Sequence, residues 1–175
     1  MNVRGNRGEK SRGRGASTAS SRADRSLRFS HNSCFRVLFE PSSRIRRMDE
    51  LVEQAREIQD RAHVPYSEYP VGAALRTADG TVYVGCNIEN ANFSNSLHAE
   101  EVAFAEAIKS GHREFDRLAV SSARRDGVTP CGMCRQTLAE FCDDDLVIVC
   151  DHGDEVKEYT LGELLPDTIT EEMLD

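Results

Sequence analysis

Two short stretches decide the fold of this chain: residues 98–100 (HAE) and residues 130–134 (PCGMC). They supply one imidazole, from His98, and two thiols, from Cys131 and Cys134. Zinc accepts one nitrogen and two sulfur ligands readily, and three protein ligands leave one tetrahedral position open. An open position can hold water, so the pattern predicts a zinc site that performs chemistry.

Glu100 lies two residues after the predicted ligand His98, so we expect it to act beside the metal as general acid and base. Each stretch alone is weak evidence, because a lone Cys-x-x-Cys pair is also found in structural zinc sites and redox pairs. The alternative interpretation is a structural zinc site or a pair of inert core cysteines. A closed structural site, however, normally needs a fourth protein ligand.

Both stretches open segments with a helical pattern. Residues 98–111 (HAEEVAFAEAIKSG) mix apolar residues with good helix formers and end at a glycine, a typical helix terminator. Residues 131–142 (CGMCRQTLAEFC) predict a second short helix with both cysteines in its opening turn. Two helix N-termini would then converge on one metal, where their positive ends favour thiolate over thiol.

The flanking segments also alternate between helix and strand patterns. Residues 49–63 predict a helix that must stop near Pro65, with an apolar face made of Leu51, Val52, Ala55, Ile58 and Ala62. Residues 71–90 predict two strands joined at residues 78–80, and a polar loop follows. Further strands are expected at residues 115–122, 146–150 and 155–160, and a short terminal helix at 161–166.

This order of elements predicts an α/β fold of three layers, in which helices flank a mixed five-stranded sheet. We expect the first two strands to be antiparallel and the middle strands to be joined by helical crossovers.

Charge divides the chain into two parts. Residues 1–47 hold 12 Lys and Arg against 3 Asp and Glu, a net charge of +9, while residues 48–175 hold 10 against 27, a net charge of −17. The first part is rich in Arg, Ser and Gly and has no helix or strand period, so we expect disorder. A basic arm and a transit peptide fit this composition. We favour a third interpretation, translated upstream sequence ahead of a true start at Met48.

The composition of residues 48–175 excludes some partners. A net charge of −17 repels phosphate backbones, so we expect no nucleic acid. No apolar run approaches the ~20 residues that cross a bilayer, so we expect no membrane contact. Of the six cysteines, Cys142 and Cys150 lie at or within apolar runs, where cysteine acts as a small buried hydrophobe. This usage favours a reducing, cytoplasmic location.

Five segments resemble the cytidine deaminase family of the small, homotetrameric, zinc-dependent type. They are residues 65–75 (PYSEYPVGAAL), 85–91 (GCNIENA), 98–100 (HAE), 130–136 (PCGMCRQ) and 164–166 (LLP). HAE followed by PC-x-x-C also matches the signature of zinc-dependent nucleobase deaminases. The resemblance covers residues 48–175, and residues 1–47 lie outside it.

The resemblance implies hydrolysis of cytidine and 2′-deoxycytidine to uridine and 2′-deoxyuridine, with release of ammonia. One Zn²⁺ per subunit, held by His98, Cys131 and Cys134, would activate the hydroxide that attacks C4. Glu100 would shuttle the protons. The family likeness also implies a homotetramer, with a homodimer as the alternative.

The same resemblance assigns substrate contacts. Asn87 and Glu89 match the family residues that hydrogen-bond the ribose 3′-hydroxyl. The backbone of Ala99 and Cys131 would contact the base and its amino group, and Tyr69 occupies the place of an aromatic residue that packs against the base.

The sequence departs from the family at several positions. Many members have Cys and then Arg where this chain has His98 and Glu101. One neutral imidazole and two thiolates already balance the zinc charge, so an arginine is less necessary, and Glu101 either points into solvent or lowers activity. Arg135 remains available to donate hydrogen bonds to a thiolate. Ile169 replaces a common phenylalanine from a neighbouring subunit, and Phe93 replaces a common tyrosine.

Two other functions stay open at this point. One is a deaminase of another aminated nucleoside, such as a blasticidin-type antibiotic. The other is a non-catalytic, zinc-stabilised binding module, which the departure at Glu101 would fit. The excess of acidic residues fits a solvated surface, and also an adaptation to high salt, where screening removes self-repulsion.

Overall fold

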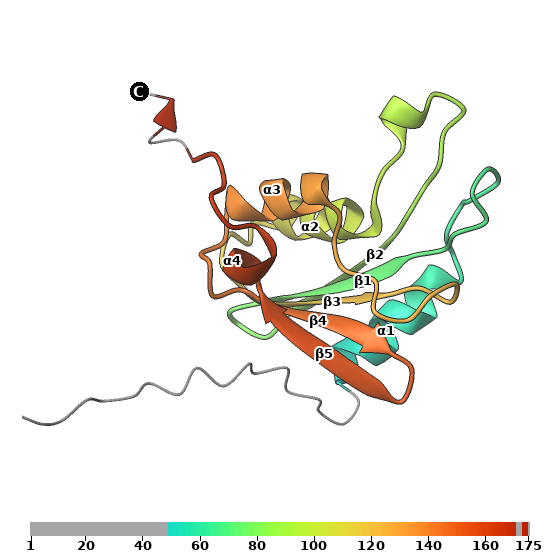
Figure 1. Cartoon of the computed structure of the whole chain (residues 1–175), viewed down its shortest axis with the longest axis horizontal. Helices are drawn as coiled ribbons and strands as arrows, with labels where there is room; N and C mark the ends of the chain where they lie inside the picture. The colour runs from blue at the N-terminus through green and yellow to red at the C-terminus, as the bar shows by residue number, and fades with distance from the viewer. Residues whose placement is uncertain (1–48, 171–172, 175) are drawn as a thin grey trace, which may run out of the picture. The chain divides into compact units, whose positions relative to one another are not determined.

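The computed structural model describes residues 49–170 and 173–174 of the 175-residue chain. The predicted basic extension 1–47 and the predicted start at Met48 lie outside these residues. The described elements, in chain order, are α1 (Glu50–Gln59), β1 (Gly72–Thr77), β2 (Val82–Cys86), the 3-10 helix η1 (Phe93–Asn95), α2 (Ala99–Lys109), β3 (Phe115–Ser121), α3 (Gly132–Ala139), β4 (Val147–His152), β5 (Glu155–Thr160) and α4 (Leu161–Leu164) (Figure 1).

The strands form one mixed sheet in the order β2-β1-β3-β4-β5. β1 pairs antiparallel with both β2 and β3, β3 pairs parallel with β4, and β4 pairs antiparallel with β5. Helix α2 connects β2 to β3, and helix α3 connects β3 to β4. The predicted mixed five-stranded sheet, with its antiparallel first pair and its helical crossovers, is confirmed.

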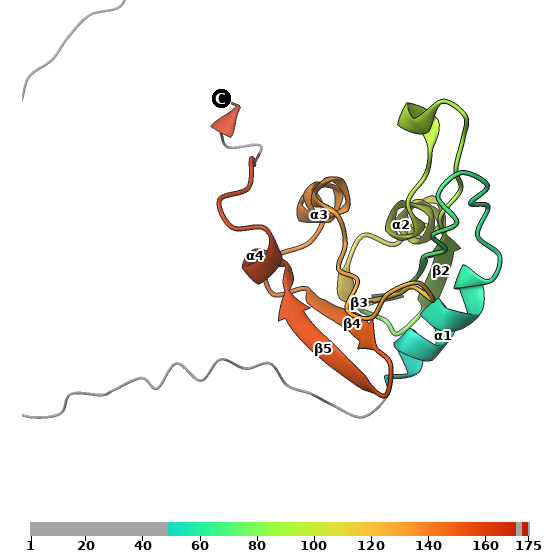
Figure 2. The same cartoon turned by 45° about the vertical axis from the view of Figure 1, so that its right-hand side comes forward.

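Helices cover both faces of the sheet and make three layers (Figures 1 and 2). α1 lies on one face, and α2 and α3 lie on the other. Because side chains alternate between the faces of a strand, Ala74 belongs to the core under α1, while Ala73 and Leu75 belong to the core under α2. Two hydrophobic cores therefore hold the sheet from opposite sides.

The start of α1 is capped by Asp49, whose carboxylate accepts a hydrogen bond at 3.0 Å from the backbone N–H two residues later. Such a cap satisfies one of the N–H groups that the first helical turn leaves without a partner. The predicted apolar face is buried at Leu51, Val52 and Ala55 and half-buried at Ile58 and Ala62.

The end of α1 differs from the prediction, because the helix stops at Gln59 and does not approach Pro65. The reason lies in the next segment, where His63 pairs with the extension of β2. The His63 N–H donates to Asn87 O at 3.0 Å, and the Glu89 N–H donates to His63 O at 2.7 Å. Because His63 takes part in this strand-like pairing, the helix ends before it reaches Pro65.

The turn between β1 and β2 forms where it was predicted. Asp79 Oδ1 accepts hydrogen bonds from the Thr81 N–H at 3.0 Å and from the hydroxyl of the buried Thr77 at 2.6 Å. Gly80 has a φ of 90°, which glycine adopts at little cost. These contacts fix the register of the hairpin.

The cysteines of the described part are all free thiols. Cys150 is buried, and Cys142 packs half-buried against the same core under α2 and α3. Burial raises the pKa of both thiols to about 12, so they stay neutral and act as apolar side chains. Within the described helices, no segment has the length and apolar character needed to cross a membrane.

Candidate metal centre

The predicted metal ligands lie at the starts of α2 and α3. β2 and β3 run in the same direction, because each pairs antiparallel with β1 between them. The chain therefore leaves both strands at the same edge of the sheet, and the following helices begin there. His98 is the N-cap residue of α2, Cys131 is the N-cap residue of α3, and Cys134 lies in the first turn of α3.

The three ligand atoms converge as predicted. His98 Nδ1 lies 3.1 Å from Cys134 Sγ and 3.2 Å from Cys131 Sγ, and the two sulfur atoms are 3.6 Å apart. Ordinary bond lengths around a tetrahedral zinc place two sulfurs about 3.8 Å apart and a nitrogen and a sulfur about 3.6 Å apart. The sulfur–sulfur distance is close to this value, and the two nitrogen–sulfur distances are about 0.4–0.5 Å shorter. The three ligand types and their convergence fit a zinc ion. Across residues 49–170 and 173–174, they form the one group of three or more side chains suited to a metal.

The environment of the sulfur atoms also fits a cation. Cys134 is buried, His98 is half-buried and Cys131 is exposed, so one side of the group is open to solvent. Burial raises the pKa of the Cys134 thiol far above its usual range, and the neighbouring Glu100 and Cys131 raise it further. A divalent cation at the ligand atoms would counter these effects and favour the thiolate.

Glu100 is brought to the same place, at the second position of α2. Its side chain belongs to a residue that is only 6% exposed. Burial raises the pKa of the Glu100 carboxyl, and the opposing effects of the helix backbone, His98 and Cys134 are smaller. A carboxyl group with a raised pKa beside a metal is suited to exchange protons near neutral pH.

Glu101 has a partner that sequence reasoning missed. Its Oε2 accepts a hydrogen bond from the backbone N–H of His98 at 3.1 Å, and the residue is half-buried. Glu101 is thus tied to the backbone of a predicted ligand residue and does not point freely into solvent. The sequence feature that could have revealed this contact is a glutamate three residues after the N-cap residue, the spacing of a capping box. The N-cap residue of that motif is usually Ser or Thr, and here it is a histidine.

Asn87 and Glu89 hold the loop that carries Tyr69. Asn87 Oδ1 accepts from the Val71 N–H at 2.8 Å, and Asn87 Nδ2 donates to Tyr69 O at 2.9 Å. Glu89 Oε2 accepts from the N–H groups of residues 66 and 67 at 2.9 and 3.1 Å. Both side chains therefore reach the same loop, as expected for residues two apart in an extended segment.

Gly85 lets α2 approach the sheet and was not singled out by sequence reasoning. A Cβ atom there would lie 2.3 Å from Ala99 O and 2.5 Å from Ala103 N, distances that atoms do not tolerate. Ala99, the first helical residue after His98, is fully buried. No local pattern reveals such a role, because the close approach joins β2 to a helix that comes later in the chain.

Arg135 differs from the expectation that it donates to a thiolate. Its Nε donates to Pro130 O at 2.7 Å, its Nη1 to Leu164 O at 2.6 Å and its Nη2 to Thr129 Oγ1 at 2.9 Å. All three nitrogens are directed to oxygen atoms, which are stronger acceptors than sulfur. Arg135 thereby ties the loop before Cys131 to the end of α4.

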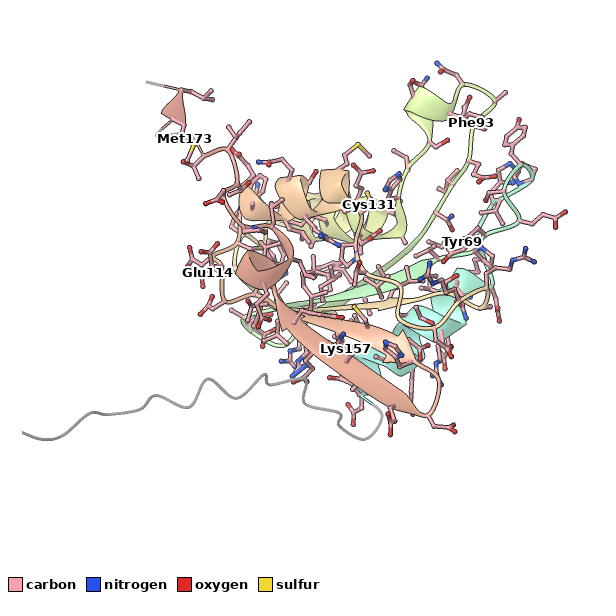
Figure 3. All side chains as sticks on the ribbon, in the orientation of Figure 1. Tyr69, Phe93, Glu114, Cys131, Lys157 and Met173 are labelled. Atoms are coloured by element: carbon pink, nitrogen blue, oxygen red, sulfur yellow. The ribbon has the colours of Figure 1, made fainter. Side chains whose placement is uncertain are left out.

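Two positions where the chain departs from the family pattern lie at the surface. Phe93 is 70% exposed on a projecting loop, where its ring meets the edge of Tyr66 with centroids 5.6 Å apart (Figure 3). Ile169 is 64% exposed, and its carbonyl accepts a hydrogen bond from Gln136 Nε2 at 3.1 Å.

Comparison with known proteins gives one family. A family model described as the cytidine and deoxycytidylate deaminase zinc-binding region matches residues 45–150. This range contains the three predicted ligand residues, Glu100 and the segment from residue 63 to residue 89 that surrounds Tyr69.

Relatives with known names and structures agree. A cytidine deaminase from Sporosarcina psychrophila is 41% identical over 128 residues, which are 73% of this chain and 94% of the relative. The crystal structure of cytidine deaminase from Burkholderia pseudomallei is similar with a TM-score of 0.65 and 40% identity, over 69% of this chain and 97% of that one. The crystal structure of cytidine deaminase from Mycobacterium tuberculosis has a TM-score of 0.63 and 36% identity, over 69% and 95%.

Proposed function

Because this chain belongs to the cytidine and deoxycytidylate deaminase family, we propose that it hydrolyses cytidine and 2′-deoxycytidine to uridine and 2′-deoxyuridine, with release of ammonia. The observation that carries the proposal is the meeting of His98 Nδ1 with two cysteine sulfurs at 3.1 and 3.2 Å, next to the buried Glu100. A purely structural zinc site would need neither the buried carboxyl group nor an exposed side.

One Zn²⁺ per subunit would be held by His98, Cys131 and Cys134. When bound, zinc would make a water molecule nucleophilic at neutral pH. The two cysteines lie at the start of α3, whose positive end favours their thiolate form. The neutral imidazole of His98 completes a ligand set whose charge cancels that of the ion.

Glu100 handles the protons of the reaction. Its carboxylate accepts a proton from the attacking water and passes it to N3 of the pyrimidine, which makes C4 electrophilic. The same carboxylate then carries the second proton of that oxygen to the departing amino group. Ammonia leaves and a carbonyl group forms at C4. Burial of Glu100 supports this role, since it raises the pKa toward the working range.

The substrate would lie between the metal and the loop that contains Tyr69. We assign the ribose 3′-hydroxyl to Asn87 and Glu89, the face of the base to Tyr69, and the base edge with its amino group to the backbone of Ala99 and Cys131. The hydrogen bonds that join Asn87 and Glu89 to the loop of Tyr69 support this assignment, because they hold the proposed sugar-binding residues and this loop together.

We expect this enzyme to be a cytoplasmic homotetramer, with a homodimer as the alternative. Four large apolar side chains are exposed in the two segments near the proposed sugar site, and contact with other subunits would remove them from water. They are Tyr66, Ile88, Phe93 and Leu97. Light scattering of the purified protein measures the assembly directly. Nucleic acid is not an expected partner, given the net charge of −17 over residues 48–175.

The activity is tested by ultraviolet absorbance, which changes as cytidine becomes uridine. We expect the zinc-loaded chain to convert cytidine and 2′-deoxycytidine, and Glu100→Gln to lose at least about 100-fold in kcat while it keeps its zinc. Glu106→Gln is the matched control, because Glu106 is an exposed acid of the same helix that pairs with Lys109. Zinc-loaded protein that leaves both nucleosides intact refutes the proposal, and deamination of blasticidin S alone favours the other aminated nucleosides.

A further inference from the structure

A capping box closes the N-terminus of α2, with a histidine as the N-cap residue. An N-cap side chain ordinarily accepts a hydrogen bond from the first helical turn. The N-cap residue here is His98, and its Nδ1 lies 3.1 and 3.2 Å from two sulfur atoms. Glu101, at the third helical position, reaches back and accepts the His98 N–H at 3.1 Å.

The placement of the imidazole depends on the backbone of His98. The body of α2 is fixed by the sheet, because Ala99 packs directly against Gly85 of β2. His98 comes before the first helical residue, in an extended conformation with φ −84° and ψ 154°. The hydrogen bond from its N–H to Glu101 connects this extended residue to the fixed helix. A rotation of the His98 backbone would carry Nδ1 away from the sulfurs.

We propose that Glu101 is a positioning residue of the metal centre, whose carboxylate holds the His98 backbone so that the imidazole faces Cys131 and Cys134. The inference rests on the proposed zinc site and deepens it. Glu101 touches neither the metal nor the substrate in this account and acts through His98 alone. The hydrogen bond matters, and the negative charge does not.

The test measures metal binding by the full-length chain. Zinc dissociation constants are obtained by competition with a chelating dye, and the absorption spectrum of the cobalt(II) form reports the ligand geometry. We expect Glu101→Ala to weaken zinc binding about tenfold, as loss of a supporting contact typically does, and to alter the cobalt spectrum. Glu101→Gln, whose amide oxygen still accepts the hydrogen bond, should bind zinc as the unmodified chain does.

Two further variants make the result decisive. Glu101→Asp keeps the charge at the helix N-terminus but is one methylene too short, so it should also weaken zinc binding. This variant keeps the test available if Glu101→Ala does not fold. Glu106→Ala removes an exposed acid elsewhere on α2 and should leave zinc binding unchanged.

Three results would overturn the inference. The first is normal zinc binding by Glu101→Ala or Glu101→Asp. If these variants were also less stable to urea, Glu101 would be a helix cap only. The second is Glu101→Gln losing as much affinity as Glu101→Ala, which would make charge the cause. The third is Glu106→Ala weakening zinc binding equally. Failure of the unmodified chain to bind zinc or to deaminate would instead refute the proposed function.

Discussion

Asp151 shows how one carboxylate anchors α1 to the sheet. It is 8% exposed and accepts hydrogen bonds from Arg56 Nε at 2.6 Å, from the Ser121 hydroxyl at 2.7 Å and from the Gly153 N–H at 2.9 Å. Burial raises the pKa of Asp151, but the hydrogen bonds outweigh it and the pKa lies below its usual value. The ionised form therefore stabilises the fold.

We predict that Asp151→Asn lowers the free energy of unfolding at pH 7 by about 1–3 kcal/mol, because Arg56 and Ser121 lose a charged acceptor. A carboxyl group with a lowered pKa stabilises above its unfolded pKa, near 4, and this contribution is lost as the pH falls through the folded pKa. The difference in the free energy of unfolding between the unmodified chain and Asp151→Asn should therefore shrink below about pH 4. Urea unfolding across pH measures this.

Asp116→Asn is the control for this experiment. Asp116 pairs with Arg76 at 2.6 Å, but both side chains are well exposed, so the pair should contribute less than about 1 kcal/mol. Equal losses from Asp116→Asn and Asp151→Asn, or a difference that does not change with pH, would contradict the role given to Asp151.

Some residue roles could be predicted from the sequence and others could not. The meeting of His98, Cys131 and Cys134 could be predicted, because these residues lie within two short stretches with metal-type spacing. Their role as zinc ligands stays a prediction. The hydrogen bonds of Arg135 were beyond reach, because one of its acceptors is Leu164, in a helix formed much later in the chain. The local sequence around Arg135 therefore does not indicate this partner.

At the scale of elements, the site exists because α2 lies very close to β2. Gly85 is the point of contact, and any side chain there would meet the backbone of Ala99 and Ala103 at 2.3 and 2.5 Å. Pushing the helix away would move His98 and Glu100 with it, since both belong to its first turn or its cap.

We predict that Gly85→Ala lowers the free energy of unfolding by about 1–3 kcal/mol, the usual cost of overpacking, and also weakens zinc binding. Gly132→Ala is the matched control, since a Cβ there meets nothing within 4 Å. The control should be neutral or slightly stabilising, as is usual for alanine in a helix. If Gly85→Ala had the same free energy of unfolding and the same zinc affinity as the unmodified protein, α2 would not be held by this contact.

Element types were predicted better than element ends. The hairpin from residue 71 to residue 90 was readable because its turn chemistry at Asp79 and Gly80 is local. The end of α1 at Gln59 was not, because the backbone pairing of His63 with the extension of β2 competes with the helix. Long-range pairing of this kind overrides the local signal of Pro65.

At the scale of the whole molecule, charge is the dominant feature. Residues 48–175 carry a net charge of −17, and residues 143–145 alone place three exposed acids in a row. Added salt shortens the range of repulsion, from about 10 Å at 0.1 M to about 3 Å at 1 M. We predict that the urea midpoint of the zinc-loaded chain rises as KCl increases over this range. A midpoint that falls with salt would show that net repulsion does not limit stability.

The arrangement of the sheet explains why two distant stretches form one site. β2 and β3 run in the same direction on either side of β1, so both following helices start at one edge of the sheet. The sequence predicted the crossovers and the meeting of the helix starts, and the sulfur and nitrogen distances confirm that meeting. The close fit at Gly85 and the cap at Glu101 emerged only with the fold.

The most direct test of the central claim is X-ray absorption at the zinc edge of the purified, zinc-loaded chain. The account predicts two sulfur ligands at about 2.3 Å and one nitrogen and one exchangeable oxygen at about 2.0–2.1 Å. A fourth ligand from the protein in place of the oxygen, or fewer than two sulfurs, would contradict it.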